Sequence, residues 1–176
     1  MVQAALEEAA PSVLSDGLDS IAMGWLDDGV LFARFTGTVT PALGRAHALR
    51  FESMTRGATG IAYFADGSGL SRYDLLVRSA FARFVLTHPK LFASITLLAT
   101  NDEVRRTVEP LVDTLGGLAY VTAEPSDFER RLLAEAPFAF RSSMFRPADA
   151  NDRGPGSAPR GRAPRSSIRP KHPFRR

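Results

Sequence analysis

The chain has 176 residues, of which 44% are hydrophobic, a length and composition that fit one globular domain with an appended segment. It has no cysteine, which excludes disulfides, a thiolate nucleophile and cysteine-ligated zinc. Of its 22 basic and 19 acidic residues, ten basic and two acidic ones lie in 141–176, so this segment carries +8 and residues 1–140 carry −5. The mildly acidic remainder argues against a nucleic-acid-binding core.

The sequence shows no sign of membrane insertion or export. No apolar run approaches the roughly 20 residues that a membrane-spanning helix needs. The N-terminal stretch contains Glu7 and Glu8 and lacks the basic region of a signal peptide. We therefore expect a cytoplasmic protein without a transmembrane segment.

The first half of the chain predicts a hairpin followed by a helix. Apolar runs at 20–26 and 30–35 flank Asp27-Asp28-Gly29, and an Asp-Gly pair between two such runs is typical of a β-hairpin. Thr40-Pro41 then has the pattern of an N-cap followed by proline at the first helical position. Apolar residues spaced three or four apart extend the predicted helix over 41–56.

Alternating strands and helices are predicted for the rest of the domain. The strand segments are continuous apolar runs without alternation, which indicates burial on both faces, as in a parallel sheet. Ser126 followed by Glu129 matches a capping box and predicts the start of the last helix. The predicted elements are strands 61–66, 91–100 and 118–123 and helices 74–88, 101–115 and 126–135, together with a short N-terminal helix over 2–9.

The order β-β-α-β-α-β-α-β-α predicts an α/β fold with a mixed β-sheet and helices packed on it. The central strand is expected to end at Asp66, before a turn at Gly67–Leu70. Right-handed crossovers would then place Asp66, Thr100 and Ala123 along one edge of the sheet, where open α/β sheets bind their ligands.

Several of these features occur together in a known family. They are the entry hairpin, Gly37 before Thr40-Pro41, Asp66 at the end of the central strand, Asp74 at the start of a helix, and Gly116-Gly117 before the last strand. In this pattern residues 19–136 resemble the STAS domain, the anti-sigma-factor antagonist fold, in its divergent SpoIIAA-like branch. The resemblance divides the chain into an N-terminal extension (1–18), a STAS-like domain (19–136) and a basic, largely disordered tail (137–176).

The sequence departs from that family at the regulatory position. In the family, the acidic residue that corresponds to Asp74 is followed by two serines and a glycine, and the second serine is phosphorylated to switch partner binding. This chain has Leu75, Leu76 and Val77 there, so Leu76 replaces the switch phosphosite. We expect the kinase-controlled cycle to be absent.

No catalytic, metal or cofactor site is expected. The run Asp66-Gly67-Ser68-Gly69-Leu70 resembles the metal-dependent adhesion motif of von Willebrand A domains, but Leu70 replaces an oxygen ligand of that site. Neither a nucleophile elbow nor a phosphate-binding glycine pattern is present. The three histidines, His47, His88 and His172, are interpreted as structural or solvated residues. The sequence therefore favours a non-enzymatic protein.

The resemblance implies a regulatory protein–protein interaction domain that binds its partner through the edge around Asp74. Two roles fit Tyr73 equally, a contact with the partner and inward packing at the start of the helix. A homodimer is a further alternative. The predicted partner-binding residues are Asp66, Ser68, Leu70, Ser71, Arg72, Tyr73, Asp74 and Arg78.

Two alternative functions are kept. The first is a carrier of a lipid or another small apolar ligand, with its pocket between the sheet and the helices. The second is binding of nucleic acid or an anionic surface through residues 147–176, which are rich in Arg, Pro, Gly and Ser and cannot bury enough apolar surface to fold. A solubilising role for this tail without a specific target is an equal alternative.

Overall fold

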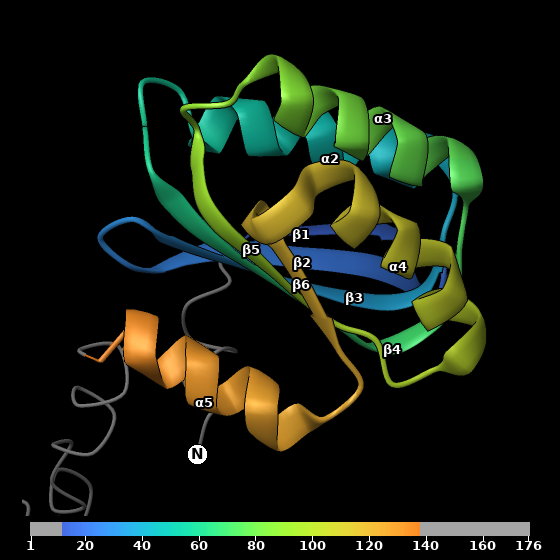
Figure 1. Ribbon diagram of the computed structural model, residues 1–176. Helices are drawn as coiled ribbons and strands as arrows, with labels where there is room; N and C mark the ends of the chain where they lie inside the picture. Colours follow the sequence, from blue (N-terminus) through green and yellow to red (C-terminus); the bar gives the residue numbers. More distant parts are fainter. Residues whose placement is uncertain (1–11, 138–176) are drawn as a thin grey trace, which may run out of the picture. The chain divides into compact units, whose positions relative to one another are not determined.

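The computed structural model describes residues 12–137, which form a six-stranded sheet with helices on both faces (Figure 1). The predicted helix over 2–9 lies outside the described residues, as does the tail from residue 138 onward, including the basic segment 147–176. The elements are β1 (Ser12–Asp16), β2 (Asp19–Asp27), β3 (Val30–Val39), α2 (Pro41–Met54), β4 (Ile61–Tyr73), α3 (Leu75–Thr87), β5 (Phe92–Leu98), α4 (Asp102–Leu115), η1 (Gly116–Leu118), β6 (Ala119–Thr122) and α5 (Pro125–Glu135).

The strands lie in the sheet in the order in which they occur in the sequence, from β1 to β6. The first three are antiparallel to each other, and β3 to β6 are parallel, so the sheet is mixed as predicted. Helices α2, α3 and α4 cover one face and α5 covers the other (Figure 1). Each face has its own apolar core, the larger one beneath α2–α4 and the smaller one around Phe64, Phe128 and Leu132 under α5.

Local signals in the sequence located most of the boundaries correctly. The hairpin at Asp27-Asp28-Gly29 joins β2 and β3, and Gly29 has the positive φ of 78° that such turns favour. The side chains of Thr40, Asp74 and Asn101 each accept a hydrogen bond from a backbone N–H in the first turn of the following helix. These caps fix where α2, α3 and α4 begin.

Two boundaries differ from the prediction. Strand β1 lies inside the segment assigned to the N-terminal extension, and it pairs with β2 through residues 12–16. The capping box at Ser126 is wrong, because α5 begins one residue earlier, at Pro125, with Glu124 as its N-cap. Proline favours the first helical position, since its fixed φ already suits the helix. Pro110 lies within α4 and does not end it.

The largest correction concerns β4. The strand does not end at Asp66 but continues to Tyr73, so the predicted turn at Gly67–Leu70 is part of the strand. Beyond Asp66 the strand is paired with β3 alone, because the register with β5 stops at the Asp66–Leu98 pair. The pairing partner is the second half of β3, which runs past the predicted end at Phe35 to Val39.

Two β-bulges interrupt this second half of β4. One extra residue lies between Asp66 and Gly69, and another lies between Leu70 and Arg72, each opposite an unbroken stretch of β3. A bulge reverses the alternation of side chains between the two faces of a strand. Leu70 and Tyr73, which are three residues apart, therefore both pack toward the larger core.

Candidate functional site

The bulges divide the predicted partner-binding residues between the two faces of β4. Ser68, Ser71 and Arg72 are exposed, whereas Leu70 is buried and Tyr73 is half-buried among residues of the larger core. The sequence predicted that all of these residues form one contact patch. In the structure only Ser68, Ser71 and Arg72 are exposed to solvent together.

Asp66 lies level with the ends of β5 and β6, as predicted, although β4 itself continues past it to Tyr73. It is opposite Arg34 of β3, whose Nε donates a hydrogen bond to Asp66 Oδ2 at 3.0 Å. The other carboxylate oxygen, Oδ1, accepts a hydrogen bond from the backbone N–H of Ser68 at 3.0 Å. With its side chain 9% exposed, Asp66 is positioned to hold β3, β4 and the first bulge together.

Two further predicted residues have structural contacts. Asp74 caps α3 by accepting a hydrogen bond from the N–H of Leu76 at 2.7 Å. Arg78 donates from Nη1 to the carbonyl oxygen of Thr107 at 3.0 Å, which links α3 to α4. A charge reversal at Asp74 would remove a cap along with any partner contact.

Leu76, at the position of the switch serine of STAS domains, is exposed, and so is its neighbour Leu75. Leu75 is 58% exposed and Leu76 is 71% exposed, at the first turn of α3 beside Arg72. Two adjacent leucines facing solvent are unusual for a helix that otherwise contributes Val85 to the core. They form an apolar corner, which we call the Leu75–Leu76 corner.

An apolar cavity of about 40 Å³ lies between the sheet and the helices α2, α3 and α4. None of its lining side chains carries a formal charge when histidine is neutral. The polar side chains in this lining are those of His47, Tyr63 and Tyr73. The full lining is Phe35, His47, Tyr63, Ala65, Gly67, Leu70, Tyr73, Phe81, Leu97, Leu98, Ala99, Val104, Val108 and Leu111.

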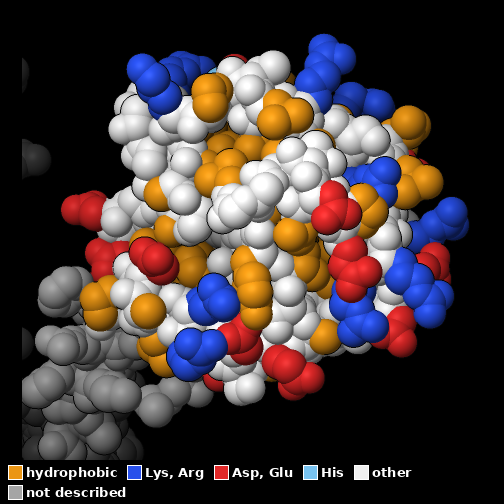
Figure 2. Space-filling view, in the orientation of Figure 1, with side chains coloured by type: hydrophobic (Ala, Val, Ile, Leu, Met, Phe, Trp, Pro, Cys, Tyr) orange, Lys and Arg blue, Asp and Glu red, His pale blue; other side chains and the backbone are white. Residues whose placement is uncertain are grey.

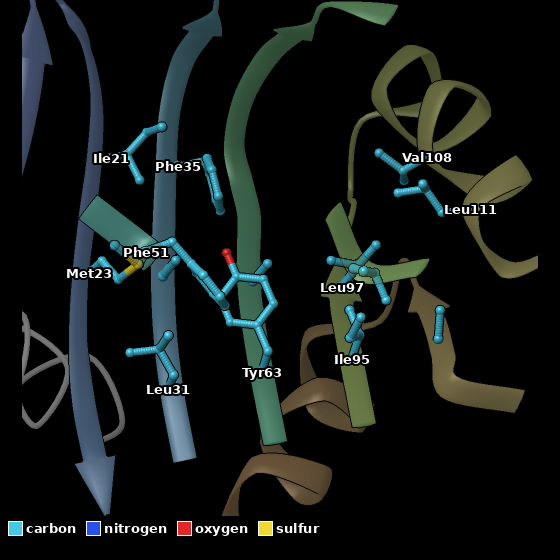
Figure 3. Packing of buried hydrophobic residues seen from close by; sticks show 14 of the residues in the cluster. Ile21, Met23, Leu31, Phe35, Phe51, Tyr63, Ile95, Leu97, Val108 and Leu111 are labelled. Atoms are coloured by element: carbon cyan, nitrogen blue, oxygen red, sulfur yellow. The ribbon is translucent and has the colours of Figure 1, made fainter. Parts of the chain in front are cut away.

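His47 and Tyr63 form a polar pair inside this apolar surrounding. Tyr63 rises from β4 beside Phe51, and its hydroxyl is the one oxygen among the labelled side chains of Figure 3. That hydroxyl lies 3.4 Å from Nε2 of His47 on α2. Phe35 and Phe51 pack edge-on against the imidazole, with ring centroids 5.3 and 6.0 Å away. Burial therefore lowers the pKa of His47 from 6.5 to about 4 and raises the pKa of Tyr63, so both are uncharged at neutral pH.

Tyr73 completes the polar set. It lines the inner cavity, and burial raises the pKa of its phenol as well. Within residues 12–137, the Tyr73 hydroxyl forms no hydrogen bond with a protein group, whereas the Tyr63 hydroxyl is paired with His47. The Tyr73 hydroxyl is therefore one polar group of the lining that is free to bind something else, and Nδ1 of His47 likewise has no protein partner among these residues.

A groove of about 280 Å³ lies outside the cavity, between α2 and α3. His47, Tyr73 and Phe81 line both spaces and separate them. The lining of the groove is apolar except for Arg45, His47 and Tyr73. On the face shown in Figure 2, hydrophobic side chains lie in the hollows between the helices, with Lys and Arg side chains around the periphery.

The width of the groove is set where α2 and α3 meet. A Cβ added at Gly44 of α2 would lie 2.7 Å from Cγ2 of Val77 on α3, closer than real Cβ atoms approach a neighbour. The two helices thus touch at Gly44 and leave room for the groove over Phe51, Phe81 and Phe84. A larger residue at position 44 would force the helices apart.

Sequence reasoning missed this site. It interpreted His47 as a structural or solvated residue and did not single out Tyr63. The alternative of a pocket between sheet and helices had the right location without any residues. The available signal was a histidine in the apolar stripe of a helix next to a strand that contains a tyrosine.

Two features are absent from the described part of the chain. None of the helices between residues 12 and 137 is long and apolar enough to cross a membrane. No three acidic or histidine side chains in the same range cluster as metal ligands would.

Comparison with known proteins places the fold. No protein-family model matches the chain, and no curated protein matches it. The structure is similar to the crystal structure of an uncharacterized protein of the DUF3478 family with a SpoIIAA-like fold from Shewanella loihica PV-4, with a TM-score of 0.52 and 19% identity. The match covers 68% of this chain and 98% of that one. The chain therefore has the SpoIIAA-like fold of STAS domains, as the resemblance in its sequence implied.

Proposed function

We propose that this protein is a non-enzymatic binder of a small, mainly apolar molecule, which it holds in the groove between α2 and α3 and the cavity beneath it. The observation that carries the proposal is the arrangement of His47, Tyr63 and Tyr73 within a lining that is apolar apart from these residues and Arg45 of the groove. Ligand sites in proteins are commonly apolar clefts with a few convergent polar groups that orient the ligand. The groove of about 280 Å³ is near the lower end of the roughly 300–1,000 Å³ typical of such sites, which favours a small ligand.

Dye binding combined with native mass spectrometry tests this function. The neutral dye N-phenyl-1-naphthylamine should become fluorescent on binding the purified protein, and a co-purified ligand should appear as a discrete added mass. Ala48→Phe fills the groove from the rim of α2 and should abolish dye binding. Ala42→Phe is the matched control, because Ala42 is exposed on the same helix and lies outside the groove lining.

The dye experiment has a clear negative outcome. If dye fluorescence is unchanged in Ala48→Phe, or is lost equally in both variants, the groove is not the binding site. Circular dichroism and urea unfolding of both variants show whether the fold is intact.

A second candidate function is protein docking through the Leu75–Leu76 corner, supported by the exposure of these two leucines beside Arg72 and Ser71. It corresponds to the regulatory interaction that the STAS resemblance implies, but its contact residues are the exposed Leu75 and Leu76 instead of the full predicted patch. The absence of a hydroxyl at Leu76 means that phosphorylation at this position would not control it. Apolar residues beside an arginine are a common composition of interaction hot spots.

Leu75 separates the two functions, because Leu76 lines the groove and Leu75 does not. Leu75→Glu should prevent capture of a protein partner from a cell extract and leave dye binding intact. Leu86→Glu, at the other end of α3 and 58% exposed like Leu75, is the control. A partner retained equally by both variants would show that the corner is not the docking site.

A further inference from the structure

The inner cavity lets the chemistry of the ligand be specified. The inference below rests on the proposed function and concerns the part of the ligand that reaches past His47, Tyr73 and Phe81. The cavity of about 40 Å³ exceeds the roughly 10–15 Å³ that one water needs on the same measure, so it takes a few atoms only. The body of the ligand must therefore lie in the outer groove, with one small end group inside.

That end group is uncharged. No lysine, arginine, aspartate or glutamate lines the cavity. A carboxylate would lose its hydration there without gaining a cation, and an ammonium would lose its hydration without gaining an anion, each at a large cost. The imidazole of His47 cannot supply the missing positive charge near neutral pH, because its burial among Phe35 and Phe51 disfavours protonation.

The hydrogen-bonding groups select among uncharged ends. The Tyr63 hydroxyl and His47 Nε2 satisfy each other at 3.4 Å. The Tyr73 hydroxyl is a donor without a protein partner within the described residues, and the Tyr73 side chain lines both the cavity and the groove. A phenol donor that a ligand shields from water is satisfied best by an acceptor oxygen. A purely apolar end group would leave it unpaired.

We propose that the ligand is a mainly apolar molecule that ends in an uncharged carbonyl group, a ketone, aldehyde or ester, whose oxygen accepts a hydrogen bond from the Tyr73 hydroxyl at the boundary between cavity and groove. The His47–Tyr63 pair lies behind this oxygen and fixes the polar wall of the cavity. Leu70, Leu97 and Val108 enclose the carbon atoms beside it.

Competition against N-phenyl-1-naphthylamine with three ten-carbon compounds tests the assignment. In the wild-type protein, 2-decanone should displace the dye at a concentration at least about tenfold below that needed for decanoate or decylamine, because the charged ends cannot be desolvated. Tyr73→Phe should weaken 2-decanone by about tenfold, the value of roughly one hydrogen bond, once its displacement curve is corrected for the dye affinity measured for that variant. Tyr120→Phe, an exposed tyrosine on β6, is the control and should change neither.

The outcomes separate this inference from the function on which it rests. If the wild-type protein does not bind the dye, the ligand-binding function itself fails. If the dye binds but decanoate displaces it as well as 2-decanone does, or Tyr73→Phe leaves the 2-decanone affinity unchanged, the carbonyl assignment is overturned and the binding function stands. Tyr63→Phe is a second test of the same part of the cavity. It removes the hydrogen-bond partner of His47 Nε2, so it should change the affinity for 2-decanone and leave the affinity for decanoate unchanged.

Discussion

Arg34 and Asp66 are directly opposite each other on the parallel strands β3 and β4, and the Arg34 Nε donates to Asp66 Oδ2 at 3.0 Å. Because Asp66 Oδ1 also accepts from the N–H of Ser68, one carboxylate joins the two strands and stabilises the start of the first bulge. Its side chain is 9% exposed and that of Arg34 is 26% exposed, so water screens the pair only in part.

Asp66→Asn should destabilise the protein by about 2 kcal/mol, between the small value of a surface ion pair and the larger cost of breaking a buried one. The amide keeps an oxygen for the N–H of Ser68, so the substitution isolates the charge interaction. Urea unfolding measures the change. Glu109→Gln breaks the exposed pair with Arg105 and should cost at most about 0.5 kcal/mol, and equal losses for the two variants would contradict this account.

Gly67 is required by the approach of β5 to β4. A Cβ at this position would lie 2.7 Å from the backbone carbonyl oxygen of Leu98, which cannot move aside as a side chain can. Gly67→Ala should therefore cost about 1–3 kcal/mol, the usual range for overpacking. Gly117→Ala meets no atom within 4 Å and should be nearly neutral. Thermal unfolding of the two variants makes the comparison, and a stable Gly67→Ala protein would show that the strands separate easily.

His47 makes stability depend on pH. Its pKa is about 4 in the folded protein and 6.5 when unfolded, so between these values the unfolded chain binds a proton that the folded one does not. The stabilisation is complete above pH 6.5 and is lost as the pH falls toward 4, by about 3 kcal/mol in total.

The measurement for His47 is the difference in unfolding free energy between the wild-type protein and His47→Gln at a series of pH values. This difference removes the contribution of the carboxylates, which titrate in both proteins. It should shrink as the pH falls from 6.5 to 4. A constant difference would mean that the imidazole has the same pKa in the folded and unfolded states.

The basic segment 147–176 lies outside the described residues, and its role stays a proposal drawn from charge. If it binds nucleic acid, the full chain should bind a labelled DNA duplex with an affinity that falls steeply between about 50 and 200 mM salt. Deleting 147–176 should abolish binding, whereas shuffling its sequence should not, because the attraction depends on charge and not on order. Fluorescence anisotropy measures both, and binding by the deleted chain would assign it to the domain.

The sequence was informative where structure is decided locally. Thr40 was recognisable as a cap because a cap needs only a short polar side chain and the next three residues. The β2–β3 turn was recognisable for the same reason. Asp74, which was predicted as the first residue of its helix and a partner contact, is the cap of α3 in the structure. Strand β1 escaped detection, since it is a short run in which Val13 is mostly exposed and its strand conformation depends on pairing with β2.

The candidate site was harder to predict because its residues come from distant segments. His47 is on α2, Tyr63 is in the middle of β4, and Tyr73 ends that strand. The stretch Gly67–Leu70 has the composition of a turn, and it becomes a strand because the end of β3 supplies hydrogen-bond partners. Which of its side chains face inward depends on the two bulges, which no single-residue preference reveals.

The bulges also change the order of inward- and outward-facing residues in β4. From Gly67 to Tyr73, one inward residue is followed by two outward ones, so that Ser68-Gly69 and Ser71-Arg72 face solvent as neighbouring pairs. A substitution scan of this stretch should find every third residue, Gly67, Leu70 and Tyr73, constrained by inward packing in a segment that is entirely strand. Gly69 should be constrained as well, because a Cβ there would lie 3.1 Å from the carbonyl oxygen of Phe35.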